Sequence, residues 1–67
     1  EESSFFTLLR AGFAHKRKLL IRNLESVVSR DTLLKSFEIC GISPSTRAET
    51  LSVSDWILLN QTIFKNF

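Results

Sequence analysis

The chain has 67 residues, of which 43% are hydrophobic and 24% charged, and this composition indicates one small globular domain rather than a disordered segment. The only cysteine, Cys40, and the only histidine, His15, cannot build a disulfide framework or a Cys/His zinc site within the chain. The longest apolar run, residues 19–21, is far too short to span a membrane, and no signal segment opens the sequence, so we expect a soluble intracellular protein.

The positive charge is concentrated near the start of the sequence. The formal net charge is +2, yet residues 1–24 carry +3 and residues 25–67 carry −1. Such an asymmetry indicates a polyanionic partner. The charged residues of the first stretch are Arg10, Lys16, Arg17, Lys18 and Arg22, against Glu1 and Glu2.

Apolar residues at spacings of three and four predict two helices in the first half. The first covers about residues 4–14 and can be capped by Ser3 or Ser4. The second covers about residues 17–29 and can follow the first after only a kink. Their apolar stripes are Phe5, Leu8, Leu9, Gly12 and Phe13 in the first helix, and Leu20, Leu24, Val27 and Val28 in the second.

A third helix is predicted from Ser29 or Asp31 onward. Gly41 ends it, because a glycine followed by apolar Ile42 is the Schellman pattern, in which Ile42 folds back on Phe37. We interpret Cys40 as a small core residue rather than a reactive thiol. The buried stripe of this helix is Leu33, Leu34, Phe37 and Cys40.

The last helix has the best-defined start in the sequence. After a turn that Pro44 can open, Ser52 and Asp55 form a variant of the capping box, flanked by the apolar pair Leu51 and Trp56. An apolar face then continues nearly to the terminus through Leu59, Ile63 and Phe67. Because no strand pattern competes, the sequence predicts an all-α fold, a small bundle of three to four helices.

The junction between the first two predicted helices is the candidate functional site. At 100° per residue, His15, Lys18 and Arg22 lie on one face, opposite the apolar stripe. Lys16 and Arg17 lie at the helix start, where cations oppose the helix dipole and a phosphate could accept the free N–H groups. The alternative is a solvated charged face, because cations are also favourable after the C-terminus of the preceding helix.

Two polar residues beside these cations have open roles. His15 can contact a partner or act as a surface spacer. Asn23 can reach a base or ribose hydroxyl, or it can hydrogen-bond to nearby backbone. The full candidate set for nucleic-acid contact is Arg10, His15, Lys16, Arg17, Lys18, Arg22 and Asn23.

Two motifs resemble a known family. The first runs from Phe5-Phe6 through Leu8-Leu9-Arg10-Ala11 and Phe13-Ala14-His15-Lys16-Arg17-Lys18 to Arg22-Asn23-Leu24. The second is Gly41-Ile42-Ser43-Pro44, then Arg47-Ala48-Glu49-Thr50-Leu51-Ser52 and a helix with Trp56. Together they are similar to the C-terminal domain of the KsgA-type rRNA adenine N6,N6-dimethyltransferases, over nearly all of the chain.

The resemblance implies a role within a larger enzyme. In this family an N-terminal Rossmann-like domain binds S-adenosylmethionine and methylates two adjacent adenosines near the end of small-subunit rRNA, while the helical domain helps to dock on the pre-ribosomal subunit. This chain lacks a Gly-rich cofactor loop and an Asn/Asp-Pro-Pro-Tyr/Phe motif. We therefore expect no catalytic, cofactor or metal site in residues 1–67. The implied partners are rRNA and the methyltransferase domain of the same polypeptide, in a cytoplasmic or organellar monomer.

The chain departs from the family pattern at individual positions. The family's basic run, more often Gln-Arg-Arg-Lys, falls on residues 15–18, and Ile21 stands where arginine is common, a loss for which Arg22 can substitute. For Arg47 and Glu49 we favour a structural role, as an ion pair that pins the turn before the last helix, over RNA contact.

Two other functions compete with RNA binding. A stand-alone helix-turn-helix module that binds DNA is one, but the last helix, with only Lys65, lacks groove-reading side chains. The other is a protein-interaction module, because six phenylalanines can exceed what so small a core hides.

Overall fold

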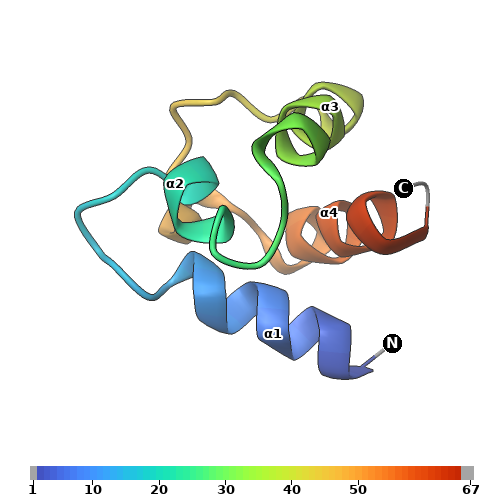
Figure 1. Cartoon of the computed structure of the whole chain (residues 1–67), viewed down its shortest axis with the longest axis horizontal. Coiled ribbons are helices and arrows are strands. Elements are labelled where there is room, and N and C mark those ends of the chain that lie inside the picture. The colour runs from blue at the N-terminus through green and yellow to red at the C-terminus, as the bar shows by residue number, and fades with distance from the viewer. Residues whose placement is uncertain (1, 66–67) are drawn as a thin grey trace.

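The chain folds into four α-helices and one short 3-10 helix. The computed structural model describes residues 2–65, and no strand occurs among them. The predicted all-α bundle of three to four helices is confirmed. None of the helices described is long and apolar enough to cross a membrane. The elements are α1 (Glu2–Gly12), α2 (Leu20–Leu24), α3 (Arg30–Cys40), η1 (Ala48–Thr50) and α4 (Val53–Lys65) (Figure 1).

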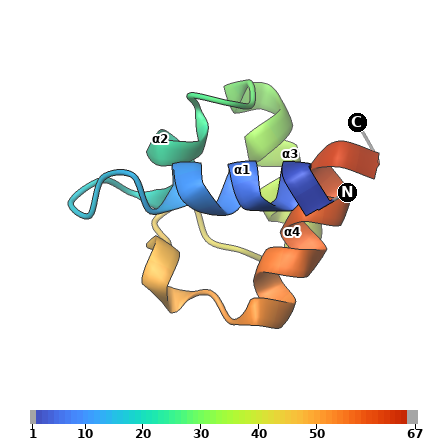
Figure 2. The same cartoon turned by 90° about the horizontal axis from the view of Figure 1, so that it is seen from below.

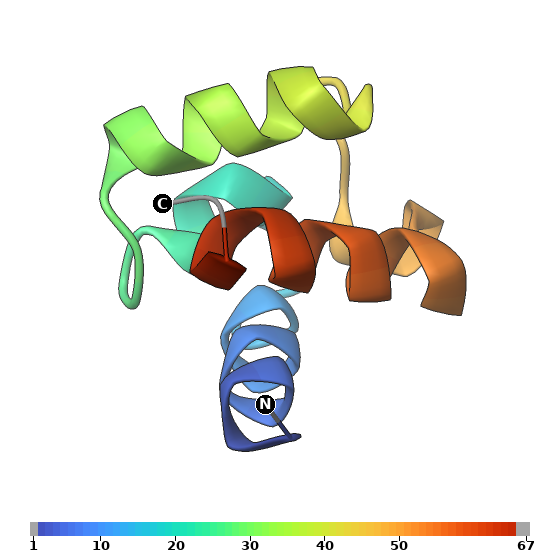
Figure 3. The same ribbon diagram turned by 90° about the vertical axis from the view of Figure 1, so that its right-hand side faces the viewer.

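The helices pack in two directions. In Figure 3, α3 and α4 run across the view side by side, whereas α1 is seen almost along its axis. The short α2 lies between α1 and α3 and contacts both (Figure 1). The segment between α1 and α2 projects from one side of the molecule, at the left of Figure 1.

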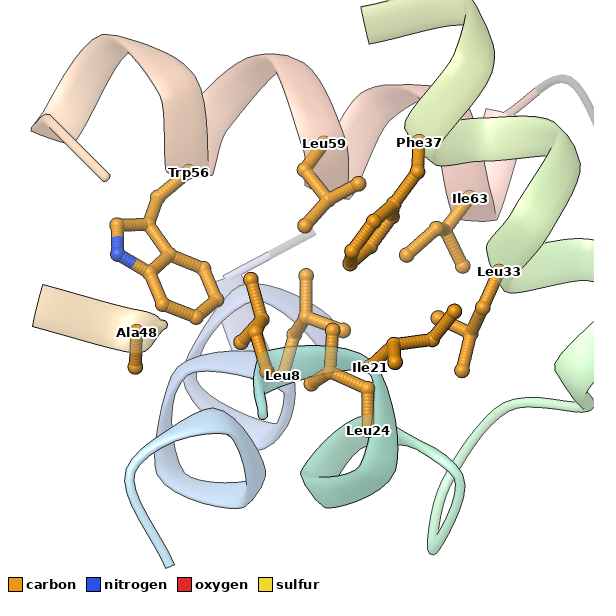
Figure 4. Packing of buried hydrophobic residues seen from close by; sticks show 10 residues of the cluster. Leu8, Ile21, Leu24, Leu33, Phe37, Ala48, Trp56, Leu59 and Ile63 are labelled. Carbon is orange, nitrogen blue, oxygen red and sulfur yellow. The ribbon is translucent and has the colours of Figure 1, made fainter. Parts of the chain in front are cut away.

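One apolar core joins all five elements. The short α2 is almost surrounded by it, because Arg22 is the only exposed residue among its five. An isolated helix of this length has little intrinsic stability, so its formation depends on this burial. The core residues are Leu8, Leu20, Ile21, Leu24, Leu33, Phe37, Ala48, Trp56, Leu59 and Ile63 (Figure 4).

The end of α1 approaches α4 closely. A Cβ atom on Gly12 would lie only 2.5 Å from Cη2 of Trp56, closer than packed atoms tolerate. The ring of the next residue, Phe13, lies 5.7 Å from the Trp56 ring between centroids. The missing side chain at residue 12 thus lets the chain leave α1 directly over Trp56.

The ends of α3 agree with their sequence signals. Ser29 caps the start, since its Oγ accepts a hydrogen bond from the Thr32 amide at 3.3 Å. Gly41 has a left-handed backbone with φ of 72°, and the Ile42 amide donates to the carbonyl oxygen of Phe37 at 2.8 Å. The predicted Schellman stop is confirmed.

The start of α4 also agrees with its signal. The Ser52 amide donates to Oδ2 of Asp55, and the Asp55 amide donates to Oγ of Ser52, each at 3.1 Å. This reciprocal pair is the predicted capping box, which is confirmed. The predicted apolar face of this helix is confirmed for Trp56, Leu59 and Ile63, which are all buried. Phe67, which was also assigned to it, lies outside the described residues.

The second predicted helix, over residues 17–29, is wrong in extent. It forms only as α2. Its start is late because residue 19 is extended and the Leu20 amide donates to the carbonyl oxygen of Thr46 instead of an upstream helical partner. After Leu24 the chain continues as turns, and Val27 is exposed instead of buried. The first helix lies two residues earlier than predicted. In α3, Leu33 and Phe37 face the core, whereas Leu34, which was expected in the buried stripe, is exposed.

Candidate nucleic-acid interface

The predicted basic residues lie on a projecting loop between α1 and α2. We call residues 15–18 (His15, Lys16, Arg17 and Lys18) the basic loop. It extends away from the helices, at the left of both Figure 1 and Figure 2. All four side chains are exposed, so three cations and one histidine are presented together to solvent. The structure therefore brings together the central part of the predicted site.

The start of the basic loop is held by Asn23 of α2. Its Nδ2 donates to the carbonyl oxygen of Gly12 at 2.8 Å and to that of His15 at 3.0 Å. Asn23 is only 4% exposed, so its amide is used inside the protein. Of the two roles open for Asn23, the structure shows hydrogen bonding to nearby backbone. We therefore no longer count Asn23 among the candidate residues for direct RNA contact.

The middle of the basic loop is held by Arg47, which precedes η1. Its Nη1 donates to the carbonyl oxygen of Arg17 at 2.9 Å and to that of Lys16 at 3.4 Å. Arg47 thus has a structural role, as we favoured, but it bonds to the loop carbonyls and not to the predicted partner, Glu49. Among residues 2–65 no ion pair joins Arg47 to Glu49.

The phosphate site expected at a helix start is not formed. Helix α2 begins two residues after the last loop cation, and the amide of its first residue, Leu20, is already paired with the Thr46 carbonyl at 2.9 Å. A five-residue helix also has little dipole to offer. Residues 16–18 therefore do not open a helix, and the dipole argument for a phosphate at this position is wrong.

Two further predicted cations flank the loop. Arg10 is exposed in the last turn of α1, and Arg22 is exposed on α2. Nε of Arg22 lies 3.9 Å from Oε1 of Glu25, and the Glu25 carboxylate also pairs with Arg30. Because exposed ion pairs are weak, Arg22 can still attract an anion, although Glu25 offsets part of its charge.

A small hollow at the base of the basic loop is lined in part by Phe13 and Glu49, which are not among the predicted contact residues. Phe13 lines it and is 50% exposed, so its ring is partly accessible for contact with a base. Glu49 lines the same hollow as His15, Lys16 and Lys18, and it places a negative charge among them. The sequence places Phe13 in the apolar stripe of the first predicted helix, so its exposure is not predicted, although it lies two residues before the basic loop. The place of Glu49 depends on folding.

Comparison with known proteins agrees with the two motifs. The chain is 46% identical over 57 residues to the "Ribosomal RNA small subunit methyltransferase A" of Acaryochloris marina, which is 85% of this chain and 21% of that protein. It is 47% identical over 53 residues to the protein of the same name from Nostoc punctiforme, covering 79% and 18%. The protein of that name from Lactiplantibacillus plantarum is 35% identical over 68 residues, covering 94% and 23%.

The chain belongs to the ribosomal RNA small subunit methyltransferase A family. It matches the C-terminal domain of the KsgA-type methyltransferases. The chain spans about a fifth of the length of the curated relatives that it matches. No family model and no solved structure matches this chain.

Proposed function

We propose that this chain is the rRNA-binding domain of a small-subunit rRNA adenine N6,N6-dimethyltransferase. In this proposal it docks the enzyme on the pre-ribosomal small subunit, so that two adjacent adenosines are methylated by a separate domain that binds S-adenosylmethionine. The relatives are named as rRNA methyltransferases, which supports the substrate class. The proposal places the enzyme in the cytoplasm or an organelle, as a monomer.

The observation that carries the proposal is the basic loop. Its three cations are exposed while its backbone is hydrogen-bonded to Asn23 and Arg47. A cationic surface that is already ordered binds a polyanion with a smaller loss of conformational entropy than a flexible one does. Contacts from lysine and arginine to phosphates raise affinity and position the protein on the RNA, but they do not read the base sequence.

The direct test is substitution of Lys16, Arg17 and Lys18 by alanine in the complete protein. We expect weaker binding to small-subunit rRNA, and a slope of log affinity against log salt that is smaller by roughly 0.7 to 0.9 for each lost phosphate contact. Filter binding over a salt series measures both quantities. The helical circular dichroism spectrum should not change, because all three side chains are exposed.

A control removes positive charge elsewhere, at Lys35 and Lys65. It should leave the affinity and the salt slope close to those of the parent protein. Equal losses in both variants would mean that net charge, not the basic loop, governs binding. An unchanged affinity in the basic-loop variant would leave a solvated charged face as the correct interpretation.

Docking against another domain of the same polypeptide is a compatible second role. Phe6 is 52% exposed and Phe64 is 43% exposed, so the core does not hide all the aromatic side chains. Phe64 also lines a shallow apolar depression with Val27. Hydrogen exchange of this chain with and without the methyltransferase domain would test the role, since a docked face exchanges more slowly.

A further inference from the structure

A single arginine from the second half of the chain fixes the middle of the basic loop. Arg47 is 30 and 31 residues away from the two carbonyl groups that its Nη1 contacts, those of Arg17 and Lys16. We propose that Arg47 is a positioning residue that holds the basic loop in the conformation that binds RNA. This inference rests on the RNA-binding function proposed above.

The two hydrogen bonds act on the part of the loop that carries the charge. They engage successive carbonyl groups, at 3.4 and 2.9 Å, and so restrict both peptide units between Lys16 and Lys18. Because the side chains of the loop are exposed, core packing does not order this segment. Without Arg47 the segment would sample more backbone conformations, and RNA binding would have to order it at an entropic cost.

The other anchors of the loop do not depend on Arg47. Asn23 bonds to the carbonyl groups of Gly12 and His15 at the start of the loop, and the Leu20 amide bonds to the Thr46 carbonyl after its end. Arg47 is itself exposed and belongs to no part of the core. Removal of its side chain should therefore loosen the loop and leave the domain folded.

A direct contact between Arg47 and an RNA phosphate is the competing explanation. The guanidinium group has five N–H donors, and the two on Nη1 face the loop carbonyls, so the remaining three could bind a phosphate. The two explanations differ in one respect. A positioning residue acts only through the loop cations, whereas a direct contact acts even when those cations are absent.

A double-mutant cycle separates them, with rRNA affinity measured for the complete protein on a transcript of small-subunit rRNA. Arg47→Ala should weaken binding roughly three- to tenfold in the parent protein, which is the range for loss of such hydrogen bonds. In the background that lacks the cations of Lys16, Arg17 and Lys18, the same substitution should change affinity by less than about 1.5-fold. Lys35→Ala, at an exposed lysine on α3, is the control for loss of one charge.

Two measurements report on the loop itself. Hydrogen exchange of the Lys18 amide, which bonds to the His15 carbonyl, should be faster in Arg47→Ala than in the parent protein. Arg47→Lys keeps the charge but loses the planar fork, so it should restore only part of the affinity. If Arg47→Lys restored it fully while loop exchange stayed fast, charge rather than positioning would be responsible.

The outcomes distinguish failure of this inference from failure of the proposed function. An equal loss in both backgrounds would show that Arg47 contacts RNA directly and would overturn the positioning role. No loss in the parent background would overturn it as well. If removal of the three loop cations itself had no effect on binding, the proposed function would fail, and the positioning role for RNA binding would fail with it.

Discussion

The start of α4 and the basic loop are both held by side-chain hydrogen bonds, but the two sets of bonds span very different lengths of chain. The capping box joins Ser52 and Asp55, three residues apart. The basic loop is joined to Asn23 across 8 residues and to Arg47 across 30 and 31 residues. The capping box can therefore form within its own short segment, whereas the conformation of the basic loop requires that distant parts of the chain have folded.

From this difference we expect the proposed RNA binding and the stability of the domain to depend on different residues. A local cap stabilises one helix, and its loss should affect only the free energy of unfolding. Anchors from distant parts of the chain couple the conformation of the basic loop to the packing of α2 and η1. Substitutions at these anchors should therefore change RNA binding as well as stability, and the following variants test that distinction.

The largest effect is expected for Asn23→Asp. The new carboxylate would lie beside the carbonyl oxygens of Gly12 and His15 in a site only 4% exposed, where it is repelled and poorly solvated. We expect a loss of about 3 kcal/mol in the free energy of unfolding near neutral pH. Urea denaturation measures this loss, and the weakened loop should also reduce rRNA affinity.

The pH dependence of the same variant has a defined sign. Burial and the neighbouring carbonyl oxygens raise the pKa of this aspartate in the folded state above its unfolded value of about 4. Its protonated form can donate one hydrogen bond, so the variant should be least impaired below about pH 4 and lose stability as the pH rises through the folded-state pKa. Asn23→Ala, which adds no charge, should lack this dependence, and an identical profile in both would contradict the explanation.

The sequence predicted those parts of the structure that are encoded within a few residues. The stop at Gly41 and the cap at Ser52 are predictable because their hydrogen-bond partners lie within five residues. The start of the second helix is not predictable in this way, because the Leu20 amide pairs with Thr46, far away in the sequence. The cations of the candidate site were identified from composition, while Arg47 as their anchor required the fold.

A smaller effect, confined to stability, is expected for Ser52→Ala. The substitution removes the oxygen that accepts the Asp55 amide and leaves one orphan donor at the start of α4. We expect a loss of about 1 kcal/mol in thermal or urea unfolding, with rRNA affinity corrected for folded fraction unchanged. A clear drop in affinity of the folded protein would mean that the start of α4 is coupled to the interface, and the contrast with the basic loop would not hold.

The smallest effect is expected for Glu49→Gln, and its sign is opposite. The Glu49 carboxylate is exposed and lines the same hollow as His15, Lys16 and Lys18, so it opposes approach of a phosphate to these cations. The neutral isostere should raise rRNA affinity roughly twofold at low salt, since surface charge interactions are weak. The gain should shrink as added salt screens the charge.

Glu38→Gln, at an exposed position on α3, is the matched control for Glu49→Gln, because it removes the same charge away from the hollow. Affinity measured for both variants over a salt series separates a local effect from net charge. An equal gain in the two would assign the effect to net charge alone. A loss of affinity in Glu49→Gln would have another meaning: the carboxylate would accept a hydrogen bond from the RNA. The proposed interface would then present an acceptor for base or ribose donors beside the loop cations.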